Sequence, residues 1–78
     1  MERVKILLNG IDKVKEFENI VRNIACNMDI IRGRYVIDAK SIMGIFSLDL
    51  SQPLELVIYN DSEEKMDLNL ISKFIVAD

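Results

Sequence analysis

The 78-residue sequence contains no histidine, no tryptophan, one cysteine and one proline. Without histidine there is no imidazole to bind a metal ion or to act as the base beside a serine or cysteine nucleophile. The single Cys26 cannot form an intrachain disulfide, a thiolate zinc site or a redox pair. The three glycines stand singly, so the chain lacks a glycine-rich phosphate loop. We therefore expect a protein that is not an enzyme and that needs neither a metal ion nor another cofactor.

The overall composition is that of a globular domain. Half of the residues are hydrophobic and 29% are charged, and the net charge of −3 gives no basic surface for nucleic acid. No apolar run approaches the roughly 20 residues of a membrane span, and residues 1–5 lack the apolar core of a signal peptide. A lone cysteine fits a reducing compartment. The composition predicts one cytoplasmic domain spanning residues 1–78, with no nucleic-acid or membrane partner.

The periodicity of the first half predicts a strand, a helix and a hairpin. Apolar residues alternate over positions 4–8, and Asn9-Gly10 ends this strand. A helix of about four turns follows from Asp12, with an apolar stripe made by Val14, Phe17, Val21, Ile24 and Met28, widened by Ile20 and Ala25. Asn27 and Asp29 are expected to end it. Strands over 28–32 and 34–37 then form a hairpin around Gly33.

The second half predicts a helix, a strand and a last helix. Ser41 begins a short helix that ends before Pro53, and residues 54–60 form an apolar interior strand. Asp61 with Glu64 resembles a capping box, and the apolar face of the last helix comprises Met66, Leu70, Ile71, Phe74 and Ile75. The order β-α-β-β-α-β-α predicts an α+β domain of two layers. Its core is expected to include Val4, Ile6, Phe17, Val21, Ile24, Ile37, Leu56, Ile58, Leu70 and Phe74.

Residues 40–50 form the most informative segment. Ser41 is a good N-cap residue, and Ile42, Met43, Ile45 and Phe46 follow it, so the first turns are apolar on every side. A short chain has little interior to cover such a helix, and part of it is expected to face a partner. Gly44 costs roughly 1 kcal/mol in a helix, which indicates either close packing or a weak position.

The run Lys-Ser-Ile-Met-Gly at 40–44 resembles HPr, the histidine-containing phosphocarrier family of the bacterial sugar phosphotransferase system. The match spans 38–50, continues more weakly through 54–60, and extends to nearly the whole chain when the flanking elements are compared. The resemblance implies an antiparallel sheet in the order 1-4-2-3 with three helices on one face. It also implies contact with phosphotransferase-system proteins through Ile42, Met43 and Phe46, and phosphorylation of Ser41 by an HPr kinase.

The segment that carries the chemistry in HPr is changed. The family has Gly-(Ile/Leu)-His-Ala-Arg-Pro before its first helix, whereas this chain has Gly10-Ile11-Asp12-Lys13-Val14-Lys15. Asp12 therefore stands at the phosphohistidine position. We interpret it as the helix N-cap. A carboxylate there also mimics part of the charge of a phosphohistidine, and acyl phosphate formation, with Lys13 and Lys15 nearby, is the alternative.

The remaining candidates have ordinary structural explanations beside the functional ones. Ser41 is explained by capping alone, and the family's regulatory phosphorylation is compatible with that role. Ile45 and Leu48 are expected in the core, whereas Met43 suits an adaptable contact surface. Basic residues 32, 34 and 40 are expected in solvent, and Cys26 is expected on the first helix as a buried apolar residue.

Two classes of function fit the sequence. The first is an HPr-like protein of the phosphotransferase system, a degenerate or regulatory paralogue that acts by protein binding without histidine phosphotransfer in sugar transport. The second is a general protein-interaction domain of HPr fold that is unrelated to sugar uptake. Weak phosphoacceptor activity of Asp12 is a third hypothesis. The sequence names no partner, sugar or signal.

Overall fold

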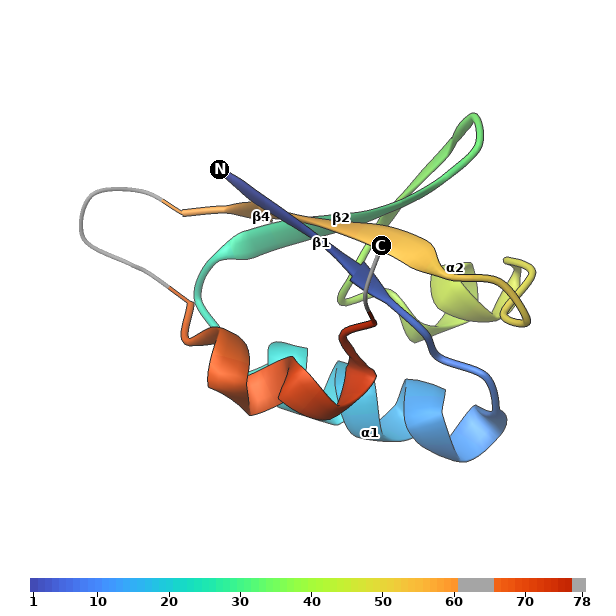
Figure 1. Cartoon of the computed structure of the whole chain (residues 1–78), viewed down its shortest axis with the longest axis horizontal. Helices are drawn as coiled ribbons and strands as arrows, with labels where there is room; N and C mark the ends of the chain where they lie inside the picture. The colour runs from blue at the N-terminus through green and yellow to red at the C-terminus, as the bar shows by residue number, and fades with distance from the viewer. Residues whose placement is uncertain (61–65, 77–78) are drawn as a thin grey trace.

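The computed structural model describes residues 1–60 and 66–76 of the chain. Four strands and three helical segments follow one another in the predicted order (Figure 1). They are β1 (Glu2–Ile6), α1 (Ile11–Val21), β2 (Asn27–Arg32), β3 (Tyr35–Asp38), α2 (Ile42–Phe46), β4 (Leu54–Tyr59) and the 3₁₀ helix η1 (Leu68–Phe74).

The four strands form an antiparallel sheet in the order β1-β4-β2-β3. One row of paired residues crosses the whole sheet: Val4 lies opposite Leu56, Leu56 opposite Ile30, and Ile30 opposite Ile37. Because side chains alternate between the faces of a strand, this row defines the core face of the sheet.

The helical segments cover that core face. Figure 1 shows α1 and η1 together beneath the sheet, and the rings of Phe17 and Phe74 join them edge to face with centroids 5.5 Å apart. Helix α2 contacts α1 and β3, and a Cβ placed on its Gly44 would lie 2.5 Å from Ile37 Cγ2. The prediction of an α+β fold with sheet order 1-4-2-3 and three helices on one face is confirmed.

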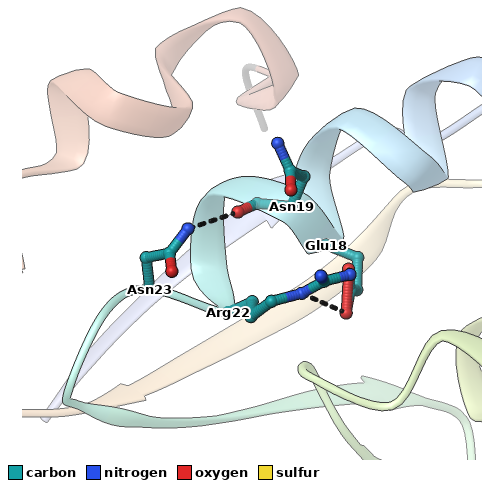
Figure 2. Close-up of polar contacts among 4 residues, drawn as sticks. All are labelled: Glu18, Asn19, Arg22 and Asn23. Carbon is teal, nitrogen blue, oxygen red and sulfur yellow. Dashed lines mark hydrogen bonds and ion pairs between the residues drawn. The ribbon is translucent and has the colours of Figure 1, made fainter.

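Helix α1 is shorter than the four turns predicted from the sequence. It ends at Val21, and the Asn23 side chain donates from Nδ2 to the carbonyl oxygen of Asn19, 3.1 Å away (Figure 2). Asn23 and Ile24 donate their N–H groups to carbonyls three residues back, which tightens the last turn. Ile24 therefore lies beyond the helix. The prediction was too long because apolar residues keep the helical spacing beyond Val21, through this turn and into the strand β2.

The predicted strand over 28–32 is confirmed as β2, which begins one residue earlier at Asn27. Three expectations about the helix at this junction are wrong. Met28 does not extend the helical stripe, and the helix ends before Asn27 and Asp29, which were expected to end it. Cys26 lies between α1 and β2 instead of on α1, although it is buried as expected. Its Sγ lies 3.5 Å from Asn60 Oδ1 and donates to it. A short strand of mixed composition is easily mistaken for the continuation of an apolar helix stripe.

The last helical segment differs from the predicted α-helix. It is a 3₁₀ helix kinked at Ile71, with three residues per turn, so Leu68, Ile71 and Phe74 share the buried side. Leu70, which an α-helical period would bury, is 51% exposed. Met66 is buried ahead of this helix, and Ile75 follows it and bridges Ile6 of β1. The predicted capping box at Asp61 and Glu64 lies outside the described residues.

Most of the predicted core is confirmed. The buried members are Ile6, Phe17, Val21, Leu56, Ile58 and Phe74, while Val4, Ile24 and Ile37 are half-buried and Leu70 is exposed. Other buried residues that complete the core include Leu8, Val14, Met28, Ile30, Ile45, Leu54, Met66 and Ile71.

Candidate functional site

The start of α1 follows a sharp turn at Gly10. Gly10 has φ of 144°, a conformation that favours glycine, and its carbonyl accepts from the N–H of Val14, 3.1 Å away. Ile11 begins the helix, and Asp12 is its second residue, so Gly10 occupies the N-cap position without any side-chain cap. The expected role of Asp12 as N-cap is therefore wrong. The Asp12 side chain is exposed in the first turn, where a carboxylate still suits the helix dipole.

The residue two positions after Asp12 faces inward. Val14 is fully buried, whereas Lys13 and Lys15 on either side of it are exposed. The position that the sequence match assigns to the phosphate-steadying arginine thus belongs to the hydrophobic core. A guanidinium there would have to leave the core or be buried without a partner, at considerable cost.

The start of α2 has the cap that α1 lacks. Ser41 has an extended backbone, and its Oγ accepts a hydrogen bond from the N–H of Gly44, 3.2 Å away. The Ser41 carbonyl also accepts from the N–H of Ile45 at 3.0 Å. The predicted N-cap role of Ser41 is confirmed, and its side chain belongs to an exposed residue.

The apolar residues of α2 divide between the core and the surface. Ile45 is fully buried, Ile42 and Leu48 are partly buried against the core, and Met43 is 77% exposed. Phe46 is 36% exposed. Of the three predicted contact residues, Met43 and Phe46 are thus exposed to a partner. Ile42 is only partly exposed, because the rest of its side chain packs against the core.

Ile11 adds a surface residue that we did not predict. It is 62% exposed, directly before Asp12 on α1. Its spacing from Val14 places it on the apolar stripe of α1. Because it is the first residue of the helix, however, it lies beyond the part of the stripe that packs on the core. Helices α1 and α2 contact each other.

Lys40 connects the start of α2 with the turn that follows α1. Its Nζ donates to the carbonyl oxygen of Ile24, 2.5 Å away, and its backbone N–H donates to Asp38 Oδ1 at 2.9 Å. Lys40 and Arg32 are half-buried, and Arg34 is exposed. The expectation that all three basic residues are simply solvated is therefore wrong for Lys40, which donates to a carbonyl in the turn between α1 and β2.

Charged contacts hold the rest of α1. Arg22 Nε donates to Glu18 Oε1 at 3.1 Å, and Figure 2 shows the two side chains meeting on the last turn of the helix. Glu18 is only 6% exposed. Lys73 of η1 donates to Glu16, and this hydrogen bond holds the pKa of the Glu16 carboxyl below its ordinary value.

The part of the chain that the structure describes holds neither a metal-ligand cluster nor a membrane-spanning helix. Within residues 1–60 and 66–76, no three His, Cys, Asp or Glu side chains gather as metal ligands. In the same part of the chain, no helix has the length and apolar character needed to cross a membrane.

Comparisons with known proteins identify the fold. No protein-family model matches the chain, and no curated protein matches it. Among solved structures, the crystal structure of HPr-C-His from Thermoanaerobacter tengcongensis is similar, with a TM-score of 0.71 and 24% sequence identity. The similarity covers 92% of this chain and 84% of that chain. Together with the strand order, it shows that the chain has the HPr fold.

Proposed function

We propose that this protein is an HPr-like member of the phosphotransferase system that acts by binding other proteins and does not relay phosphate through histidine. It would be a degenerate or regulatory paralogue of the phosphocarrier. The observation that carries this proposal is the combination of an HPr fold with Asp12 and the buried Val14 in the segment that matches the phosphohistidine loop. A chain without an imidazole cannot form a phosphohistidine, so binding is the activity that such a fold retains.

The surface proposed for binding joins the first turn of α1 to the exposed side of α2. It comprises Ile11, Asp12, Ser41, Met43 and Phe46, with Ile42 at its edge. Exposed apolar side chains with polar neighbours have the usual composition of an interaction surface, in which a few anchors supply most of the energy. Met43 is the strongest anchor candidate because it is the most exposed apolar residue of α2 and its side chain is flexible.

The phosphorylation state of the protein tests the proposal directly. The protein is incubated with phosphoenolpyruvate and enzyme I, and separately with ATP and an HPr kinase, and its mass is measured. We expect no transfer from phosphoenolpyruvate through this protein to a sugar permease. Phosphate added by the kinase and absent from Ser41→Ala would identify Ser41 as the regulatory site. Efficient relay by the parent protein would refute the proposal.

The same experiment tests Asp12. An acyl phosphate on Asp12 would be labile to hydroxylamine and absent from Asp12→Asn, whereas a phosphoserine would be stable. Asp12→His should not restore full relay, because the matched arginine position is the buried Val14 and the proline position is Lys15.

A binding assay with phosphotransferase-system proteins distinguishes this proposal from a general interaction domain. Met43→Ala should weaken binding by about 1–2 kcal/mol, roughly a tenfold change in dissociation constant. Leu70→Ala is the matched control, since Leu70 is an exposed apolar residue on η1 outside the proposed surface. Ser41→Asp should change the affinity for the same partner by adding charge to the surface. Absence of binding to enzyme I, a sugar permease and the kinase would favour the general domain.

A further inference from the structure

The two edges of the sheet are treated differently. On the β1 side, the last residue of η1 and the residues after it cover the edge: Leu7 N–H donates to the Phe74 carbonyl and Val76 N–H donates to the Lys5 carbonyl, both at 2.9 Å. The other edge is β3, which is followed directly by α2, and no strand formed by residues 1–60 or 66–76 lies beyond it. In Figure 1 the β2–β3 hairpin extends upward, away from α1 and η1.

The alternation of hydrogen-bonded and non-hydrogen-bonded pairs between β2 and β3 shows which backbone groups of β3 point to solvent. Ala39 N–H donates to the Met28 carbonyl, so the pair 28–39 is of the hydrogen-bonded kind. Because the two kinds of pair alternate, 30–37 and 32–35 are hydrogen-bonded, whereas Val36 lies opposite Ile31 in a non-hydrogen-bonded pair. The N–H and carbonyl of Val36 therefore point to the open edge, together with the N–H of Asp38 and the carbonyl of Arg34.

The side chains of this edge are exposed and apolar in the middle, with opposite charges at the ends. Tyr35 is 62% exposed and Val36 is 61% exposed. Arg34 is exposed and has no ion-pair partner among the residues that the structure describes, and neither has Asp38. Asp38 Oδ1 accepts from the N–H of Lys40, and its other carboxylate oxygen remains available.

The sequence 34–38, Arg-Tyr-Val-Ile-Asp, complements itself when two copies run antiparallel. With Val36 opposite Val36 of a second copy, each Arg34 lies opposite an Asp38, and each Tyr35 lies opposite an Ile37. In this register, the backbone N–H and carbonyl groups that point away from β2 in one copy face the same kind of groups in the other copy. Two hydrogen bonds would join the Val36 residues, and two more would run from Asp38 N–H to the Arg34 carbonyl. A shift of two residues toward the α2 end would instead place Arg34 opposite Lys40, a repulsive pair.

We infer that β3 is a homodimerisation edge, where a second copy of this chain adds its own β3 antiparallel about Val36 and makes a continuous eight-stranded sheet. Charges on edge strands ordinarily keep copies apart. Here their order along the strand makes them attractive in one register. The surface is distinct from the one proposed for binding through α1 and α2. A five-residue pairing falls below the size of a standard interface, so the dimer should be weak and should form at high protein concentration.

The first test measures association of the full chain by sedimentation equilibrium up to millimolar concentration. We expect reversible dimerisation that weakens as salt is added, because the Arg34–Asp38 pairs are exposed. Hydrogen exchange at the Val36 amide should slow as concentration rises, while the Ile37 amide, already paired to β2, should not change. A chain that stays monomeric, or whose Val36 amide exchanges at the same rate at every concentration, would overturn the inference.

A charge-exchange pair makes the test specific for the register. Arg34→Glu alone and Asp38→Lys alone should each lose self-association by tenfold or more, since like charges then face one another. Mixing the two variants should restore dimers, because every cross-strand pair in the heterodimer is again of opposite sign. Lys15→Glu, the matched control on α1, changes the net charge as Arg34→Glu does and should associate like the parent. Failure of the mixture to associate while the parent does would overturn this register.

A backbone variant provides a second, independent test. Val36→Pro removes an N–H that β2 does not use, so proline is compatible with the fold at this edge but should abolish the dimer. Val36→Thr keeps the N–H and should retain it. Both variants are checked for a parent-like circular dichroism spectrum at low concentration. Undiminished association of a folded Val36→Pro would contradict the proposed pairing.

Discussion

Helices α1 and α2 begin in opposite ways, although the sequence gives each of them a polar residue suited to capping. Ser41 closes the first turn of α2 through its hydrogen bond to Gly44. Asp12, one of the best capping residues by type, lies one position inside α1, and the turn at Gly10 begins that helix without a side-chain cap. Capping thus depends on which residue the preceding turn places at the boundary, and residue type alone does not decide it.

The comparison also separates the ways in which the two helices are held. Helix α2 has five residues and is fixed by its cap, by buried Ile45 and by the close approach of Gly44 to Ile37. Helix α1 has eleven residues and is fixed by its buried apolar face and by ion pairs at Glu16 and Glu18. Changes in local geometry should therefore affect α2 most, and changes in charge should affect α1 most.

The largest expected effect is that of Gly44→Ala. In an ordinary helix this change stabilises by up to about 1 kcal/mol. Here the added methyl would lie 2.5 Å from Ile37 Cγ2, so we expect a loss of roughly 1–2 kcal/mol in the free energy of unfolding. Denaturant unfolding measures it. In an Ile37→Ala background that clash is absent and the nearest remaining atom is Ser41 Oγ at 3.1 Å, so Gly44→Ala should then cost clearly less than in the parent. Stabilisation of the parent by Gly44→Ala would disprove the close packing.

A somewhat smaller effect is expected on α1 from Arg22→Met. This change leaves the buried Glu18 carboxylate without its cation and should lower the free energy of unfolding, by an amount limited by the exposure of Arg22. Adding Glu18→Gln removes the unpaired charge, and the double variant should recover part of the loss. Urea unfolding of the four proteins of this cycle gives the coupling energy. Equal losses for Arg22→Met with and without Glu18→Gln would show that the pair contributes little.

The two helix starts are compared directly by Ser41→Ala and Asp12→Ala. Ser41→Ala removes a side-chain cap and should cost about 1 kcal/mol. Asp12→Ala removes only a favourable interaction with the helix dipole and should cost roughly 0.3 kcal/mol. Thermal and denaturant unfolding at low salt measure both changes. An equal or greater loss for Asp12→Ala would restore the capping role that its residue type suggests.

How far the sequence predicts this molecule depends on the length of each pattern. The strand predicted at 54–60 and observed at 54–59, and the hairpin at Gly33, could be predicted because their signals lie within a few residues. The end of α1 was not, because Met28 continued the helical spacing by coincidence. Leu70 was misplaced because three residues per turn, instead of 3.6, set the buried face of η1.

In the candidate site, too, features set by neighbouring residues were predicted more easily than contacts between distant residues. The cap at Ser41 was predicted from a short local segment, and the exposure of Met43 was predicted from the resemblance to HPr and the flexibility of its side chain. The inward position of Val14 was predicted by its place in the apolar stripe of α1 and is confirmed. The carbonyl contact of Lys40 was not predicted, because it depends on a residue 16 positions away. Hydrophobic periodicity thus predicts the buried face of α1, whereas contacts between distant segments follow from tertiary packing.

The smallest effect concerns pH and the ion pair between Glu16 of α1 and Lys73 of η1. The hydrogen bond from Lys73 lowers the pKa of Glu16 below its value in the unfolded chain. The stabilisation is therefore fully present above the unfolded pKa of about 4.5 and is lost as pH falls through the folded pKa. The Lys73→Met variant should thus differ from the parent at pH 7 and converge with it at pH 3. Unfolding free energies at both pH values test this.

Because both side chains are largely exposed, the difference at pH 7 should be small and should shrink further in high salt. A difference that persists unchanged at pH 3 would assign the effect to packing of the Lys73 stem on Phe74, whose ring centroid lies 5.9 Å from Nζ, instead of to the ion pair.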